Sequence, residues 1–348
     1  MTEKFQFAWI DDTPERARDY IGALAVTLRG EAVDADLEVF PIQDGFINDV
    51  SKRAGEWSAS PPSLIMIDHS FTKVDHRAFN IQGSALAHLL RLQLPTIPMV
   101  CVSGQNFDTD DFSVEDISEY TYMFPITTLN DEGCLETLFA IAKDFPLFQF
   151  PEKQGVRNLL VEALLAPEAD KQALRSVLPE EFEETFKHST SPHRLARWVL
   201  NVLMSRPGFL SDPLEVATML GLTEKAFTEK ASEHFETALY RGPFATSRKP
   251  LWWTTSIADV LYEVLPGEAA LLPNEAGRRL PGIEEADYSI CAVSGEVSPP
   301  PDVVAYTDAT ASTRQAVRNV YTEPLSEEAS SLLGFSTRLK IRNTRRRG

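Results

Sequence analysis

The chain has 348 residues, of which 43% are hydrophobic and 24% charged, and its formal net charge is −18. This composition is typical of a folded protein, and the length is sufficient for two or three domains. The acidic balance argues against a protein whose whole surface binds nucleic acid or anionic lipid.

Three cysteines occur without zinc-ligand or C-x-x-C spacing, which favours a reducing compartment. The first residues, Met-Thr-Glu-Lys-Phe, contain no apolar signal stretch. No apolar run approaches the ~18 residues that a membrane span needs. We therefore expect a cytoplasmic protein with no membrane partner.

The first 150 residues alternate short apolar runs with amphipathic helical patterns. We expect buried strands at residues 5–10, 37–42, 63–67, 97–102 and 120–123. Helix-start signals and helical periodicity predict helices that begin at Thr13, Gly45, Gly83 and Asp131. Because strands that alternate with helices form parallel sheets covered on both faces, we predict an α/β domain over residues 1–150.

The pattern changes after a boundary flanked by Pro146 and Pro151. Residues 151–242 are helical in pattern throughout, with no convincing strand, and predict an α-helical domain. Residues 243–337 predict a smaller α+β domain, with a helix at 252–265 that carries a tryptophan pair. The strands expected in this domain are 303–306, 317–321 and 335–341.

A basic tail follows at residues 338–348. It holds six positive charges and no acidic residue: Arg338, Lys340, Arg342, Arg345, Arg346 and Arg347. Such a run is typical of a flexible arm that contacts nucleic acid or an acidic partner, although it can also be merely a solvated end.

Three carboxylates stand where expected strands end: Asp11 and Asp12 after the first, and Asp68 after the third. In a doubly wound sheet, ligands bind outside the carboxyl ends of the strands. Converging carboxylates repel one another, and Mg²⁺ relieves this repulsion by binding their oxygens. The cation would also help Asp68 to accept a phosphoryl group, with Ser103 donating its hydroxyl to a phosphoryl oxygen. The alternative is that Asp12 or Thr13 simply caps the following helix.

In this order the motifs resemble the receiver domain of bacterial response regulators, over about residues 4–145. The matching residues are the metal-binding pair Asp11-Asp12, the phospho-accepting Asp68, Gly83 opening the next helix, the hydroxyl residue Ser103 and the switch aromatic Tyr122. The resemblance implies a flavodoxin-like, doubly wound parallel sheet of five strands. It also implies a bound Mg²⁺, a role in two-component signal transduction, and a protein partner such as a histidine kinase or an effector subunit.

Two features depart from the receiver pattern. The family carries a lysine before the proline that follows the fifth strand, and this chain has Phe124-Pro125 instead. That lysine normally pairs with the phosphorylated aspartate, so its absence puts phosphotransfer in doubt. The loop between Asp68 and Gly83 is also long, and Lys73 within it is a candidate substitute cation.

Residues 212–227 resemble a helix-turn-helix, because Ala217 precedes the turn glycine Gly221 by four positions. The second helix, expected at 223–239, would be the one that reads DNA. It carries four acidic residues against two lysines: Glu224, Glu229, Glu233 and Glu236 against Lys225 and Lys230. Because acidic residues weaken binding to phosphates, an ordinary helical hairpin is the favoured interpretation.

The function predicted first is an atypical response-regulator-like signalling or adaptor protein that acts through protein–protein contacts. The alternative is a transcriptional regulator that binds DNA through the helix-turn-helix at about 212–240. A third hypothesis places an active site after residue 240, but the sequence shows no catalytic constellation there, and we do not expect an enzyme.

Overall fold

The chain forms two compact units, and each draws on separate stretches of sequence. The computed structural model describes residues 4–12, 15, 18–20, 22–24, 34–41, 46–71, 81–104, 118–129, 131–150, 155–179, 182, 191–205, 208–292, 294–297, 302–306, 315–318, 322–324 and 337–339. The first unit combines Met1–Ala163, Pro179–Leu200 and Thr246–Arg248. The second combines Leu164–Leu178, Asn201–Ala245 and Lys249–Gly348. The sequence predicted three domains, that is, three pieces that fold independently. This division stays a prediction.

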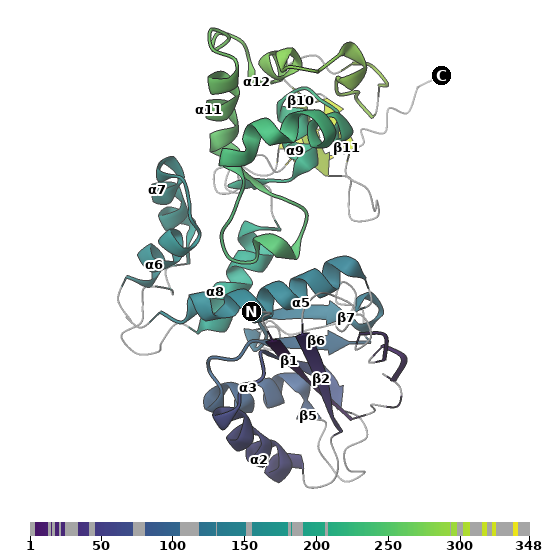
Figure 1. The fold of residues 1–348 in the computed structure, drawn as a ribbon, viewed down its shortest axis with the longest axis vertical. Helices are drawn as coiled ribbons and strands as arrows, with labels where there is room; N and C mark the ends of the chain where they lie inside the picture. Colours follow the sequence, from purple (N-terminus) through teal and green to yellow (C-terminus); the bar gives the residue numbers. More distant parts are fainter. Residues whose placement is uncertain are drawn as a thin grey trace. The chain divides into compact units, whose positions relative to one another are not determined.

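A five-stranded parallel sheet is the centre of the first unit (Figure 1). Its strands are β1 (Lys4–Asp11), β2 (Asp34–Pro41), β3 (Leu64–Asp68), β6 (Met99–Ser103) and β7 (Tyr122–Pro125). They lie in the order β2-β1-β3-β6-β7, which is the flavodoxin-like order 2-1-3-4-5. The predicted doubly wound α/β sheet is therefore confirmed. The order of the chain reverses between β1 and β3.

Helices cover both faces of this sheet: α2 (Phe46–Ala59) and α3 (Gly83–Gln93) lie on one side, and α5 (Glu132–Asp144) on the other (Figure 1). On the α2 and α3 side, Ile10, Ile67 and Cys101 belong to one buried cluster with Leu90 of α3. On the α5 side, the rings of Phe5 and Phe7 meet Phe139 edge-on, with ring centres 5.5 and 5.6 Å apart. Burial on both faces explains why the strands are apolar without a polar alternation.

Two parts of the first unit differ from the prediction. Where the sequence predicted a long loop between Asp68 and Gly83, two short strands, β4 (Ser70–Phe71) and β5 (Ile81–Gln82), pair antiparallel. Strand β7 begins at Tyr122, two residues later than predicted. The expected helix start at Thr13 lies outside the described residues, although residues 18–20 and 22–24 are helical.

The second unit contains α7 (Glu168–Val177), α9 (Pro213–Met219), α10 (Glu224–Ala226), α11 (Thr254–Val264) and α12 (Pro273–Ala276). Two expectations were wrong here. The supposedly strandless region holds β8 (Leu210–Ser211), which pairs antiparallel with β9 (Trp252–Trp253). The tryptophan pair is therefore in a strand, and α11 begins only at Thr254. Bulky aromatic side chains favour a pleated strand, and both tryptophans are buried.

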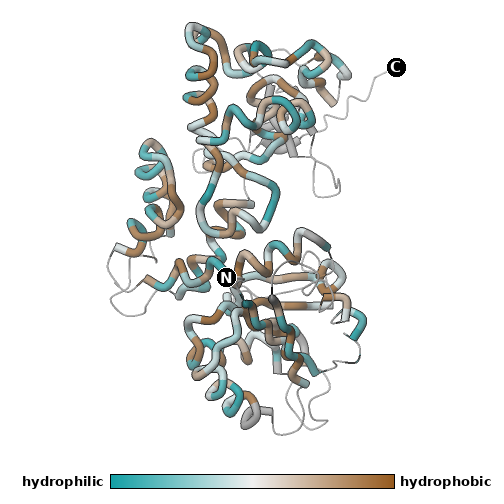
Figure 2. The backbone as a smooth tube through the Cα atoms, in the orientation of Figure 1, coloured by the Kyte–Doolittle hydropathy of each residue, from teal (hydrophilic) through white to brown (hydrophobic). Residues whose placement is uncertain are grey.

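Helix α11 shows the amphipathic pattern that its burial requires. Brown and teal bands alternate along it in Figure 2, and its buried residues are Ile257, Val260 and Leu261.

A four-stranded sheet follows in the order β11-β10-β13-β12. Its strands are β10 (Asp302–Tyr306), β11 (Gln315–Arg318), β12 (Thr322–Pro324) and β13 (Thr337–Leu339), and of these β12 was not predicted. Within the described residues, no helix combines the length and apolar composition that a membrane crossing requires.

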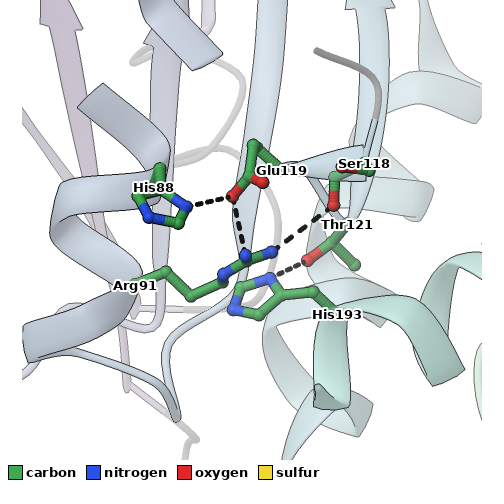
Figure 3. Close-up of polar contacts among 6 residues, drawn as sticks. All are labelled: His88, Arg91, Ser118, Glu119, Thr121 and His193. Carbon is green, nitrogen blue, oxygen red and sulfur yellow. Dashed lines mark hydrogen bonds and ion pairs between the residues drawn. The ribbon is translucent and has the colours of Figure 1, made fainter. Parts of the chain in front are cut away.

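Helix α8 (Pro192–Trp198) belongs to the first unit, although its sequence lies beyond the predicted boundary at residue 150. Its His193 is fully buried, and the ring nitrogen Nδ1 lies 2.9 Å from the Thr121 hydroxyl just before β7 (Figure 3). Beside it, Arg91 of α3 forms an ion pair of 2.7 Å with Glu119. These contacts join α3, α8 and the start of β7 at the amino-terminal edge of the sheet.

Burial, together with the smaller effect of the positive charges of Arg91 and Arg197, lowers the pKa of His193 to about 3. The folded ring therefore stays neutral at a pH where the unfolded ring is protonated. Because the folded pKa lies below the unfolded one, this group's contribution to stability is present above pH 6.5. It is lost as the pH falls towards 3.

We predict that the free energy of unfolding falls between pH 6.5 and pH 4, with His193 contributing up to about 1.4 kcal/mol per pH unit. His193→Gln should flatten this slope in urea titrations, because the substituted side chain does not titrate. Thr121→Val is the matched control: it removes the hydroxyl but keeps the buried ring, so the slope should persist at lower overall stability. An identical slope in wild type and His193→Gln would contradict the assignment.

Candidate functional site

The three carboxylates predicted from the sequence meet at the carboxyl edge of the parallel sheet. Asp11 ends β1, Asp12 follows it, and Asp68 ends β3, so the group lies where the strand order reverses. One carboxylate oxygen from each residue lies within 4.8 Å of the other two. Asp11 is buried, whereas Asp12 and Asp68 are partly exposed. Doubly wound sheets bind their ligands at this edge, where the strand order reverses.

Three negative charges at this separation disfavour one another unless a cation or hydrogen-bond donors offset them. Carboxylate oxygens are the ligands that Mg²⁺ takes in proteins, usually together with several waters. A cation held by Asp11, Asp12 and Asp68 would screen the approach of an anionic phosphoryl group to the Asp68 carboxylate. The donor set therefore fits Mg²⁺.

The strand register places Phe124 in the same row as Asp68. Asp68 pairs with Val102, and Val102 pairs with Phe124. Paired residues of neighbouring parallel strands present their side chains to the same face, and the strands are ~4.8 Å apart. Ile67, Cys101 and Met123 pack in the cluster on the α2 and α3 side. The residues that follow them, Phe124 included, therefore project from the α5 side, and Phe124 lies about two strand spacings from Asp68.

The ring of Phe124 is buried and packs against the ring of Tyr122, with the ring centres 4.8 Å apart. A hydrocarbon ring supplies no charge-assisted hydrogen bond, so this position gives a phosphorylated Asp68 no cation. Lys73, the candidate substitute, lies outside the described residues. Ser103 ends β6 and is buried, one residue beyond Val102.

Gly83 makes the close approach between α3 and Asp68 achievable. A Cβ atom at this position would lie 2.1 Å from the backbone oxygen of Asp68 and 2.7 Å from the hydroxyl oxygen of Tyr120. The Gly83 N–H also donates to the His69 carbonyl oxygen at 2.7 Å. The sequence identified Gly83 only as the start of a helix, whereas Tyr120 was missed because no local pattern points to it.

The segment that resembles a helix-turn-helix has the expected turn. Gly221 adopts φ +70°, and α9 begins with a capping box in which Asp212 and Glu215 satisfy each other's backbone N–H. The second helix is not the single helix expected at 223–239: it breaks into α10, η5 (Phe227–Ala231) and η6 (Ser232–Ala238). Phe235 leaves helical geometry at φ −103° and ψ 21° while its ring is buried.

Charge on this second helix does not favour DNA. Glu229, Glu233 and Glu236 are exposed, and Lys230 donates to Asp287 in an ion pair of 2.6 Å. Because phosphates repel carboxylates, such a face weakens nucleic-acid binding. The DNA-binding alternative stays a prediction.

The contact with nucleic acid or an acidic partner that the basic tail suggests stays a prediction as well. Lys340, Arg342, Arg345, Arg346 and Arg347 lie outside the described residues. Arg338 falls in β13, with its side chain not described.

The three cysteines are buried. Burial, and then the charge of Asp131, raise the pKa of the Cys134 thiol to about 12, so this thiol stays protonated.

We predict that Gly83→Ala destabilises the protein by about 2 kcal/mol or more, because the added methyl group would displace backbone rather than a flexible side chain. Gly55→Ala is the matched control, since nothing lies within 4 Å of a Cβ at this exposed position of α2. This control should instead stabilise the helix by up to about 1 kcal/mol. Urea unfolding measures both, and a Gly83→Ala protein as stable as wild type would contradict the close approach.

No protein-family model matches the chain, and no curated protein matches it. Ten chains of solved structures match it. One of these is a response regulator protein from Burkholderia pseudomallei, whose structure contains a phosphorylated aspartic acid, a calcium ion and citrate. It is 16% identical, the match covers 51% of this chain and 85% of that chain, and the TM-score is 0.26. A likeness this distant carries no argument about function, which has to come from the chain's own residues.

Proposed function

We propose that the first unit is a receiver-like signalling module that acts as an adaptor through protein–protein contacts. Asp11, Asp12 and Asp68 bind Mg²⁺, and Asp68 is a phospho-acceptor that small donors use poorly. The partner is a histidine kinase or an effector subunit.

The observation that carries this proposal is the convergence of three carboxylates at the reversal of strand order. Simple helix capping needs one carboxylate or hydroxyl, and it does not account for a third from another strand. The flavodoxin-like strand order and the hydroxyl of Ser103 at the end of β6 add support.

The same row of residues supports the adaptor role over a phosphorylation switch. Transfer from acetyl phosphate forms a bond between an Asp68 oxygen and phosphorus, while the bond from phosphorus to acetate breaks. The product carries added negative charge, which lysine would balance and Phe124 does not. Packing of Phe124 against Tyr122 instead favours one fixed arrangement of β7.

We predict that Mg²⁺ binds the full-length protein weakly and that Asp68→Asn weakens this binding by more than about tenfold, because one carboxylate ligand is lost. Isothermal titration calorimetry measures both. Asp36→Asn is the matched control, because this substitution removes the same charge away from the site. Asp36 is exposed on β2 beside Lys4. Equal Mg²⁺ affinity in wild type and Asp68→Asn would leave the cluster with a structural role alone.

We predict that acetyl phosphate with Mg²⁺ labels the wild-type protein slowly, and that Phe124→Lys accelerates labelling at Asp68. The lysine would reach over Val102 and supply the missing cation. Intact-protein mass spectrometry follows the phosphoryl group, and Phe124→Leu controls for the loss of aromatic packing.

Rapid labelling of the wild type would contradict this prediction and make Lys73 the first candidate for the cation. In that event, Lys73→Ala should abolish the labelling. Equally slow labelling of wild type and Phe124→Lys would contradict the role assigned to Phe124.

A further inference from the structure

Three residues of the chain, Thr246–Arg248, belong to the first unit, whereas the residues before and after them belong to the second. We call these three residues the clip. The clip lies more than one hundred positions along the chain from the strand and helix that it contacts. No local sequence pattern predicts such a placement.

The middle of the clip is bound to α5. Ser247 is buried at 1% exposure, and its carbonyl oxygen accepts a hydrogen bond of 2.9 Å from the hydroxyl of Thr137. Thr137 is also buried, and its hydroxyl lies 2.7 Å from the Gly133 carbonyl oxygen within the same helix. A buried backbone carbonyl needs a partner, and here α5 supplies it.

The end of the clip is bound to β7. The guanidinium group of Arg248 donates to the hydroxyl oxygen of Tyr122 at 3.2 Å. The Tyr122 ring in turn packs on Phe124, the residue in the same row as Asp68. Arg248 therefore contacts β7 directly, through a ring that packs on the residue two strands away from Asp68.

The chain that enters the clip is held in a strained conformation. Phe244 is fully buried with φ +64°, a left-handed conformation that bulky residues rarely adopt. Such strain costs about 1 kcal/mol or more and persists only where the surroundings enforce it. The Tyr240 hydroxyl donates to the Pro243 carbonyl oxygen at 2.9 Å, which fixes the preceding turn. The residues that precede the clip are therefore held in one backbone conformation.

We propose that the clip is an intramolecular ligand of the surface formed by β7 and α5. It occupies the Tyr122 hydroxyl and the Thr137 hydroxyl, and it closes this surface to other partners. This inference goes beyond the proposed function and does not depend on cation binding or phosphotransfer.

The rate at which trypsin cleaves the full-length protein after Arg248 measures how readily the clip is released. Trypsin cleaves after Arg248, whereas the bond after Lys249 precedes Pro250 and resists cleavage. Arg241, with 60% of its side chain exposed, is a reference site in the same protein. In wild type, cleavage after Arg248 should be slow relative to cleavage after Arg241.

Tyr122→Phe removes only the hydroxyl that Arg248 binds, and Thr137→Val removes only the hydroxyl that Ser247 accepts from. Each should raise the ratio of cleavage at Arg248 to cleavage at Arg241 by roughly two- to tenfold, as the loss of one hydrogen bond implies. Tyr262→Phe is the matched control, because its hydroxyl donates to the Leu271 carbonyl oxygen within the second unit. An unchanged ratio in both test variants would overturn the proposal.

Hydrogen exchange on variants of the clip itself gives an independent test. Arg248→Gln should speed amide exchange in peptides covering β7, by several-fold, while Lys249→Gln should not. Lys249 differs by one position and pairs with Glu224 within the second unit. Equal exchange of β7 in wild type and Arg248→Gln would exclude a role for the Arg248 contact. Failure of Mg²⁺ binding would leave these results unaffected, because none of the variants alters the acidic residues.

Discussion

The parallel register of β1, β3, β6 and β7 is the constraint on which the rest of the first unit depends. Paired residues in parallel strands project to the same face, so Asp68, Val102 and Phe124 form one row. A shift of one residue in any strand would move its side chain to the opposite face and separate the row. The packing of α2 and α3 on one face and of α5 on the other resists such a shift, because each face buries a different set of apolar residues.

Much of the first unit was predictable because its signals are local. Apolar runs of four to six residues identified the strands, and the aspartates that follow the first and third runs marked the carboxyl edge of the sheet. The phenylalanine before Pro125 could be recognised as a departure, and its contact with Tyr122 follows from their spacing of two within a strand. The short strand β8 and the start of α11 were not predictable. Strands of two residues, such as β8 and β9, are too short to show a periodicity in the sequence.

The contacts that were missed join residues far apart in sequence. His193 meets Thr121 across 72 positions, and Arg248 meets Tyr122 across 126. Each depends on where two elements pack, and neither residue type at either position is unusual by itself. Sequence patterns therefore located the acidic site, because its residues stand at the ends of strands. They gave no indication of the clip, because no local pattern marks its residues.

The placement of the clip also has a consequence for synthesis on the ribosome. Thr137 is made 110 residues before Ser247, which accepts its hydrogen bond. At typical elongation rates this interval lasts roughly 5–20 s, far longer than a helix or a hairpin needs to form. The sheet and α5 therefore exist for a time with the Thr137 hydroxyl and Tyr122 uncovered. Each newly made molecule passes through a period in which a partner present during translation has access to a surface that the finished chain covers by itself.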